Sequence, residues 1–346
     1  MKLTVAGGVG EHGRNCFYVE SSTGAFLLDC GTMPGSDEPY PRLTDNQIKS
    51  VKWLFISHSH VDHTGAYDWL CKHGFTGRVV LTKETSKQVP FSPKCVCLID
   101  ELTPALLNFN LDKGLSVLWG KSGQCAGSVW YRIDSNGESI LFSGDYIEDT
   151  LVYLCDPIRD ITADIAILDS AYGDAEYTHA DYCAALVNTI MDYIKQKKTV
   201  LFPVPKFGRG LELLVLLYKH FTRIPIKLDE HLKKELSRVD DFSEWIKPAF
   251  LADIKNIPFS DVGETGFIFI SDPQLKTSAG QDMAKEIINR RGKIIVTGHA
   301  DAESYSEHLL KSGQATPLRY PVHLSNAERN GLECANSFVK VVGYHH

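Results

Sequence analysis

The chain has 346 residues, 43% of them hydrophobic, which exceeds the usual size of one domain and predicts about two. Its formal charge of −7, from 43 acidic and 36 basic residues, excludes a protein that coats nucleic acid by overall charge, so any phosphate-binding groove must be local. The first residues do not resemble a signal peptide and no apolar run reaches the roughly 18 residues of a membrane span, so the sequence predicts a soluble, cytoplasmic protein.

The glycine-rich opening at residues 8–13 fits the dinucleotide-binding pattern G-x-G-x-x-G. That pattern requires a helix directly after it, whereas residues 15–20 have the apolar, β-branched and aromatic texture of a strand. The opening is therefore interpreted as a hairpin or tight loop. The nine cysteines are scattered without paired spacing, which predicts reduced thiols and argues against a zinc ribbon.

A predicted strand at residues 51–56 leads directly into a cluster of metal-ligand side chains. His58, His60, Asp62 and His63 follow within seven residues of the strand. Imidazole and carboxylate groups together suit zinc or a similar divalent cation, and chemistry collects at the carboxyl ends of strands in α/β folds. The alternative is a polar loop whose histidines cap a helix near Gly65, which does not require four ligand types at such close spacing.

Other polar side chains elsewhere in the chain also follow short apolar segments. Seen singly, each is more often a capping or turn residue than a ligand. The set consists of Asp29, Asp145, Asp169, His299 and His323.

The second half of the chain has a different texture from the first. Short strands dominate up to about residue 172, and then amphipathic helices over 179–196, 209–220 and 279–290 alternate with strands at 199–202 and 267–270. This alternation predicts a separate α/β domain.

The order H-x-H-x-D-H in residues 58–63 resembles the signature of the metallo-β-lactamase superfamily, and residues 7–15 resemble the opening of its RNase J-like ribonucleases. An inserted α/β domain resembles the β-CASP group, whose members process RNA or DNA. The resemblance covers nearly the entire chain. It implies an α/β fold, namely a metallo-β-lactamase αββα sandwich formed by residues 1–172 and 294–346, with a β-CASP insertion at 173–293.

The resemblance also implies two zinc sites. His58 and His60 would hold the first ion, while Asp62 and His63 would hold the second. Asp145 would bridge the two ions, and the early Asp29 would brace the metal loop. His323 is expected as the last histidine of the second site.

One ligand position departs from the family pattern. Related chains carry Gly-His-x-x-Gly-Ser, and Gln124 stands where the third histidine of the first site belongs. An amide oxygen is a poorer zinc ligand than imidazole, so the first site is expected to bind more weakly. Three interpretations remain open: Gln124 is the natural residue, it was introduced to disable the enzyme, or Cys125 replaces it as a thiolate.

Three further segments carry the β-CASP resemblance. Residues 169–174 resemble its acidic motif A, 298–301 its motif B and 321–323 its motif C. This implies catalytic roles for Asp62, for Asp169 and for His299, which would contact the scissile phosphate or the leaving oxygen.

The resulting expectation is a zinc-dependent phosphodiesterase acting on nucleic acid, most simply a ribonuclease, with DNA as the other candidate substrate. Two alternatives from other classes stay open. A hydrolase of small esters or thioesters would share the zinc loop but would not need the insertion, and a non-catalytic RNA-binding scaffold would tolerate Gln124. The oligomeric state, including a homo-oligomer, is left open by the sequence.

Overall fold

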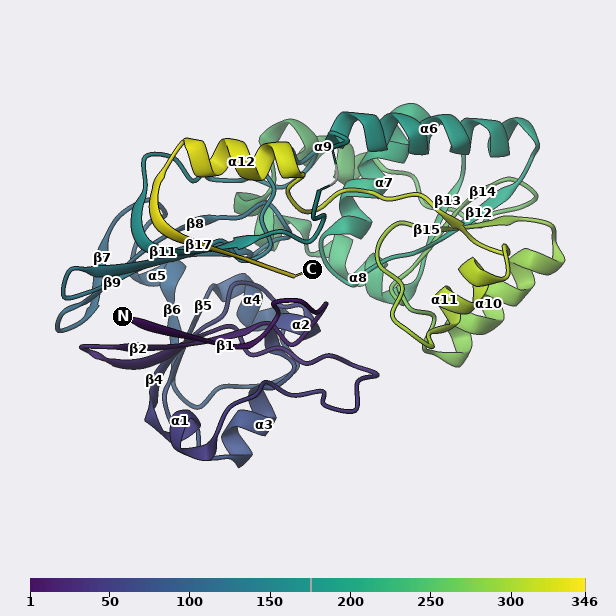
Figure 1. Ribbon diagram of the computed structural model, residues 1–346. Coiled ribbons are helices and arrows are strands. Elements are labelled where there is room, and N and C mark those ends of the chain that lie inside the picture. Colours follow the sequence, from purple (N-terminus) through teal and green to yellow (C-terminus); the bar gives the residue numbers. More distant parts are fainter. Residues whose placement is uncertain (175, 346) are drawn as a thin grey trace. The chain divides into compact units, whose positions relative to one another are not determined.

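The computed structural model describes residues 1–174 and 176–345. The chain forms two compact units, shown in Figure 1. The first unit comprises Met1–Glu148, Leu154–Glu176 and Val322–His346, and the second comprises Asp149–Tyr153 and Tyr177–Pro321. Across the described residues, no helix is both long and apolar enough to cross a membrane.

The first unit contains two six-stranded sheets. In the first sheet, the strands β1 to β3 are antiparallel and β3 to β6 are parallel. Its strands and the helices among them are β1 (Lys2–Gly7), β2 (Cys16–Ser21), β3 (Gly24–Leu28), α1 (Asp45–Ser50), β4 (Val51–Phe55), α2 (Val61–Thr64), α3 (Tyr67–Lys72), β5 (Arg78–Leu81), α4 (Lys83–Gln88), β6 (Val96–Leu98) and α5 (Ile99–Leu102).

The second sheet has the strand order β17-β11-β10-β9-β8-β7. The last strand of the chain, β17, pairs in parallel with β11, which pairs in parallel with β10. These elements are β7 (Phe109–Asp112), β8 (Leu115–Lys121), β9 (Val129–Ser135), β10 (Glu138–Phe142), β11 (Thr162–Asp169), α12 (Asn326–Cys334) and β17 (Ser337–Tyr344).

The two sheets of the first unit pack face to face through aromatic side chains. The ring of Phe17 on β2 lies 5.6 Å from that of Phe142 on β10. Tyr131 of β9 contacts Phe55 of β4, and its hydroxyl donates a hydrogen bond to the Ile56 carbonyl oxygen at 2.9 Å. Burial of such rings supplies much of the apolar area that stabilises the sandwich.

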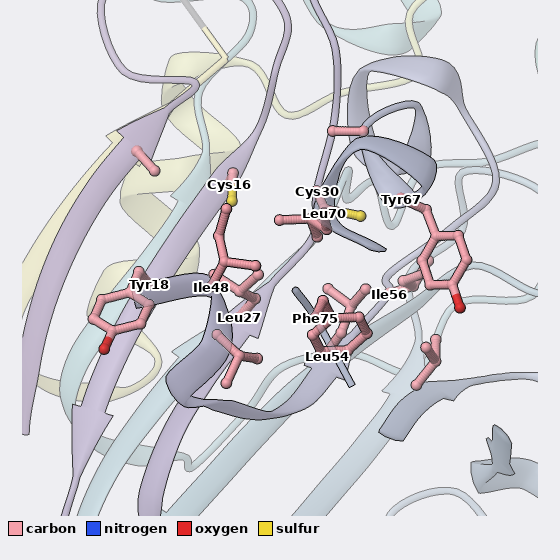
Figure 2. Close-up of a cluster of buried hydrophobic side chains, with 14 of the residues drawn as sticks. Cys16, Tyr18, Leu27, Cys30, Ile48, Leu54, Ile56, Tyr67, Leu70 and Phe75 are labelled. Carbon is pink, nitrogen blue, oxygen red and sulfur yellow. The ribbon is translucent and has the colours of Figure 1, made fainter. Parts of the chain in front are cut away.

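Each sheet carries helices on its outer face. Figure 2 shows the apolar cluster beneath the first sheet, where Leu27 and Leu54 of the strands meet Ile48 of α1 and Leu70 of α3. On the second sheet, the cluster around Trp130 includes Leu332 of α12. The order helix, sheet, sheet, helix confirms the predicted αββα sandwich.

The second unit is an α/β domain with a five-stranded parallel sheet in the order β13-β14-β12-β15-β16. The helix α6 starts with a capping box between Thr178 and Asp181. Its elements are α6 (His179–Lys195), β12 (Thr199–Pro203), α7 (Arg209–His220), β13 (Ile226–Leu228), α8 (Glu230–Ser237), the 3-10 helix η1 (Val239–Trp245), α9 (Pro248–Asn256), β14 (Gly266–Ile270), α10 (Ser278–Asn289), β15 (Lys293–Val296), α11 (Tyr305–Lys311) and β16 (Thr316–Pro317).

A buried carboxylate ties separate segments of this second unit together. Glu212 of α7 is 3% exposed and accepts backbone N–H hydrogen bonds from the three residues 151–153. It also accepts the hydroxyl of Tyr320 at 2.8 Å. Residues 149–153 therefore pack with the second unit, although they lie far from the rest of it in the sequence.

The boundary of the insertion differs from the sequence-based expectation of 173–293. The second unit extends to Pro321, because β15 pairs with β12 and β16 pairs with β15 in the same sheet. Consequently His299 belongs to the second unit, whereas His323 belongs to the first.

Candidate metal centre

The ligand-rich loop lies where the sequence predicted it, directly after a buried strand. The strand β4 ends at Phe55, and the helix α2 begins at Val61 with His60 as its N-cap. His58 and His63 are fully buried, at 0% exposure each. The local sequence therefore presents imidazoles from both the loop and the first turn of α2.

His58, His60 and Asp145 form one group of potential metal ligands, with one donor atom from each lying within 4.8 Å of the others. His58 Nε2 lies 3.0 Å from His60 Nδ1 and 3.5 Å from Asp145 Oδ2. Ligands around a tetrahedral zinc with bonds of about 2.0–2.1 Å are about 3.3 Å apart. The spacing of this group fits such an ion.

A second group consists of Asp62, His63 and His345. His345 Nε2 lies 3.2 Å from Asp62 Oδ2, and His63 Nε2 lies 3.1 Å from Asp145 Oδ1. The two carboxylate oxygens of Asp145 thus face different groups: Oδ2 faces His58 and Oδ1 faces His63. This is the arrangement expected of a carboxylate between two cations.

His345 was missed by the sequence reasoning. It directly follows β17, whose parallel pairing with β11 aligns Tyr344 with Asp169. Carboxyl ends of parallel strands share one edge of a sheet, so this pairing brings the end of the chain to the ligand cluster. An apolar strand ending in histidine was the signal that could have identified it.

His323 lies at the same cluster but is held by a different acid. Its Nδ1–H donates to Asp169 Oδ2 at 2.7 Å, whereas Asp145 Oδ2 is 3.9 Å away. It also forms a third possible ligand group with Asp145 and His345. The geometry thus brings His323 to the candidate centre while linking it most closely to Asp169.

Asp169 is fully buried at the end of β11 and accepts three hydrogen bonds. Besides His323, the donors are the backbone N–H groups of Tyr146 and Ala171, each at 3.0 Å. His299, for which the sequence predicted a catalytic role together with that of Asp169, is exposed and belongs to the second unit. Within the first unit, the imidazole that pairs with Asp169 is that of His323.

Gln124 lies inside the cluster, at 4% exposure. Its Nε2 donates to Asp145 Oδ2 at 3.1 Å, and its Oε1 is buried without a hydrogen-bond partner among the described residues. The neighbouring Cys125 is also buried, and burial raises the pKa of its thiol above its usual value. A thiol in that state is a poor metal ligand, which disfavours the replacement of Gln124 by a Cys125 thiolate.

Asp29 braces the metal loop from below. One of its carboxylate oxygens accepts the N–H of Ser57 at 2.7 Å, and the other accepts the Ser57 hydroxyl at 2.7 Å and the Nδ1–H of His63 at 2.6 Å. A carboxylate on one ring nitrogen fixes the tautomer of an imidazole and directs its other nitrogen to a metal. For His63 that other nitrogen is Nε2, which faces Asp145.

A close backbone contact joins Asp29 and its neighbours to the same loop. A Cβ atom added at Gly31 would lie 1.6 Å from the carbonyl oxygen of Asp62. That oxygen also accepts the N–H of Asn15 at 2.9 Å. Glycine is therefore required at position 31 for the loop to approach this closely.

The electrostatics of the cluster favour a bound cation. Burial alone would raise the pKa of Asp62 and the pKa of Asp145, yet the neighbouring imidazoles hold both pKa values well below the usual value of a carboxyl group. Burial likewise opposes the shift at His345, but the two carboxylates raise the pKa of that group to about 10. At His63 the same carboxylates raise the pKa well above its usual value, while burial lowers the pKa of His58. The ionised carboxylates are therefore stabilised by positive charge within the cluster.

The residues present fit a divalent metal. Neither ring nitrogen of His345 makes a hydrogen bond of suitable geometry among the described residues, although carboxylate oxygens lie 3.2 Å and 3.3 Å away. Buried polar atoms without partners are rare, and a metal ion between the imidazole and the carboxylates would satisfy them. The nitrogen and oxygen donors suit zinc, among other divalent ions.

Comparison with known proteins relates part of this chain to one superfamily. Residues 9–96 match the metallo-beta-lactamase superfamily. A solved protein of unknown function from Enterococcus faecalis V583 has the same fold, with a TM-score of 0.60 and 12% identity over 99% of this chain and 93% of that one. Over residues 9–96 the chain therefore resembles the metallo-β-lactamase superfamily.

Three proteins of known sequence resemble a larger part of this chain. The "Probable RNase MJ4" of Methanocaldococcus jannaschii is 24% identical over 91% of this chain and 82% of its own length. The "Endoribonuclease ysh1" of Aspergillus fumigatus is 24% identical over 97% of this chain but only 46% of its own length. The "Transcription termination factor FttA" of Cenarchaeum symbiosum is 24% identical over 63% of this chain and 39% of its own. These similarities agree with the resemblance to the β-CASP group that the motifs of the chain predicted.

Proposed function

We propose that this chain is a zinc-dependent ribonuclease with a weakened first metal site. The observation that carries the proposal is Asp145, whose two carboxylate oxygens face two separate ligand groups. The names of the relatives, which include a probable RNase and an endoribonuclease, support RNA as the substrate. Two divalent ions held close together are a recurrent arrangement for cleaving phosphodiesters.

The proposed ligand sets follow the two groups around Asp145, which serves both. The first set has two imidazoles and lacks a third, because its expected position holds an amide. The second set is complete and includes the histidine at the end of β17. The first set is His58, His60 and Asp145 with Gln124 beside them, and the second is Asp62, His63, His345 and Asp145.

Two bound zinc ions supply Lewis acidity that acidifies water and neutralises charge on the phosphate. The protein's own groups then orient the reaction. Asp62, at 22% side-chain exposure, is more accessible than Asp145, which makes it the carboxylate suited to orient an attacking water. Asp145 is buried and already shared by both ligand sets, so its role is to hold them together.

A histidine beside the ligands provides a group for proton transfer. Asp169 holds the Nδ1–H of His323 at 2.7 Å, which leaves Nε2 to exchange a proton with substrate. An acid that fixes the tautomer of a catalytic imidazole is a common arrangement in general acid–base catalysis. We assign His323 to this role and not to the ligands of the second site.

His299 is retained as a proposed contact to the scissile phosphate or the leaving oxygen. It is exposed, and its backbone carbonyl oxygen accepts a hydrogen bond from Gln274 at 3.1 Å. That contact ties the segment after β15 to Gln274 through the backbone. His299→Ala is expected to reduce RNA cleavage and leave zinc content unchanged.

Gln124 weakens the first site in two ways. Its amide is a poorer ligand than imidazole, and its Nε2–H occupies a lone pair on Asp145 Oδ2, the oxygen that faces His58. Replacement by histidine supplies a nitrogen ligand and removes this competing donor. The variant Gln124→His is therefore expected to bind a second zinc ion more tightly.

Zinc stoichiometry and RNA cleavage of the native chain beside Gln124→His test the proposal. The expected result is close to one tightly held ion in the native chain, two in the variant, and faster cleavage by the variant. Gln124→Asn, which keeps an amide, is the matched control. Equal stoichiometry and equal rates in native chain and Gln124→His would contradict the claim that this position limits the site.

The substrate class is tested in the same preparation. Zinc-loaded Gln124→His should cleave labelled RNA and lose that activity when zinc is chelated. Turnover of a chromogenic ester without cleavage of RNA would instead identify a small-molecule hydrolase. Zinc-free protein that binds RNA but cleaves neither substrate would identify a scaffold. Labelled DNA of the same sequence separates the two nucleic acids.

A further inference from the structure

A groove on the first unit lies away from the metal centre, at the opposite end of β4. It has a volume of about 570 Å³ and is bordered by residues 49–53, 76–78 and part of β7. The groove is at the amino end of β4, whereas the ligand loop follows the carboxyl end. The six residue steps from Lys52 to His58 span at most about 20 Å at 3.3 Å per residue.

Three cations border this groove: Lys49, Lys52 and Arg78. All three are exposed, and none has a carboxylate oxygen within 4.0 Å among residues 1–174 and 176–345. Asp45, on the same helix as Lys49, is instead paired with His73 at 2.8 Å. The positive charge of Lys49 also helps to lower the pKa of Asp45, so nearby acids offset only part of the charge of the cluster.

The lone acid in the wall of the groove does not cancel this charge. Asp112 accepts the N–H of Lys113 at 2.7 Å and forms no ion pair with the three cations. Elsewhere many basic side chains are paired, as Lys233 is with Glu230 at 2.7 Å. Against a net charge of −7, three unpaired cations around one groove form a local basic site of the kind that the sequence analysis required.

Two of the cations are held in place by neighbouring groups. The Arg78 guanidinium lies 5.5 Å from the centre of the Trp53 ring, a cation–π contact that restricts its orientation. Lys52 Nζ donates to the Thr23 carbonyl oxygen at 2.9 Å. A guanidinium fixed in this way binds phosphate at a lower entropic cost. Trp53 itself is 6% exposed, so it cannot stack on a base.

We propose that this basic groove binds the phosphate backbone of an RNA strand outside the cleavage site. The inference rests on the proposed ribonuclease function, since it takes the substrate from there. An RNA strand of 20 nucleotides is long enough to occupy the groove and the metal centre together, so a longer RNA should gain more affinity from the groove than a very short one.

The experiment compares RNA binding by the full chain and a charge-neutralised variant. The variant carries Lys49→Gln, Lys52→Gln and Arg78→Gln. Its matched control carries Lys195→Gln, Lys233→Gln and Lys285→Gln, which removes the same charge from ion-paired surface lysines of the second unit. Binding of fluorescent 20-nucleotide and 4-nucleotide RNAs is measured by anisotropy with zinc chelated, over a range of salt concentrations.

Each phosphate contact to a single strand contributes about 0.7 to the slope of log affinity against log salt. The groove variant should therefore lower the slope for the 20-nucleotide RNA by about 2 and weaken its binding. The 4-nucleotide RNA, which has only three internal phosphates, should bind more weakly throughout and lose less affinity in the groove variant, and the control variant should show no change. An equal loss in both variants would show a general charge effect and overturn the proposal, as would an unchanged slope in the groove variant.

Two further readouts separate the possible failures. Tripolyphosphate can be added as a competitor. If it abolishes the difference in RNA binding between the native chain and the groove variant, and if both RNA lengths bind with equal affinity, the groove would be assigned to a small polyphosphate instead. Turnover of bis(p-nitrophenyl) phosphate by zinc-loaded protein reports the metal centre alone and should be the same in the native chain, the groove variant and its control. Absence of that turnover in native and Gln124→His protein would contradict the ribonuclease function without altering the binding result.

Discussion

The substitution Asp29→Asn probes how the residue behind the metal loop controls metal binding. Asp29 accepts three hydrogen bonds, two from Ser57 and one from His63, and is fully buried. Its φ is 58°, in the left-handed region. Asparagine tolerates that conformation better than alanine does, so the substitution changes the hydrogen bonds with little added backbone strain.

The expected magnitude follows from counting donors and acceptors. The asparagine amide keeps one acceptor oxygen and replaces the other by an N–H₂ group, so at least one of the three donors at Asp29 loses its partner. A buried donor without a partner costs about 1–3 kcal/mol. Typical domains have unfolding free energies of about 5–15 kcal/mol, so the variant should still fold.

The effect on metal binding should be the larger signal. When the carboxylate is lost, the Nδ1–H of His63 is no longer held and Nε2 is no longer directed at the second ligand set. Loss of such a supporting group typically lowers metal affinity by about 10- to 100-fold. Zinc titration against a competing chromogenic chelator measures this change, and urea unfolding of the zinc-free protein measures stability.

Asp229→Asn is the matched control. Asp229 accepts the N–H and the hydroxyl of Ser271, both at 2.6 Å, and the N–H of Leu232 at 2.9 Å, in the second unit. It should lower stability by a similar amount without altering zinc affinity. If Asp29→Asn and Asp229→Asn were to destabilise the protein equally and both leave zinc affinity intact, the argument that Asp29 directs His63 would be refuted.

Three further predictions concern residues that the structure singles out. His345→Ala should lose about one zinc ion by elemental analysis. His323→Ala should not, because the His323 imidazole is held by Asp169, which is outside both proposed ligand sets. Equal losses in the two variants would contradict this assignment. Gly31→Ala should destabilise the fold by about 1–3 kcal/mol in urea unfolding, because its Cβ would lie 1.6 Å from a carbonyl oxygen. Gly331→Ala in α12, where the Cβ would enter open space, should instead stabilise the fold by about 0.5–1 kcal/mol. Glu212→Ala leaves three backbone N–H groups and a tyrosine hydroxyl without an acceptor. It should lower the free energy of unfolding by about 3 kcal/mol or more, and Glu212→Gln should lower it less. A loss below about 1 kcal/mol in Glu212→Ala would contradict the role of Glu212.

The sequence by itself determined the features that depend on neighbouring residues. The metal loop could be predicted because a buried strand and four ligand side chains lie within 13 residues, 51–63, and strand geometry places them at one edge of a sheet. The helices of the second unit were also predictable, since α6 and α7 carry their own apolar faces and α6 its own capping box.

The tertiary structure decided what depends on strand pairing across long stretches of chain. Only the parallel pairing of β17 with β11 brings His345 to the cluster, and only the membership of β15 and β16 in the sheet of the second unit moves the boundary to Pro321. The partner of Asp169 was likewise set by this packing, since His323 lies 154 residues away in the sequence. Sheet register joins residues by their positions in space, and periodicity within a segment carries no information about it.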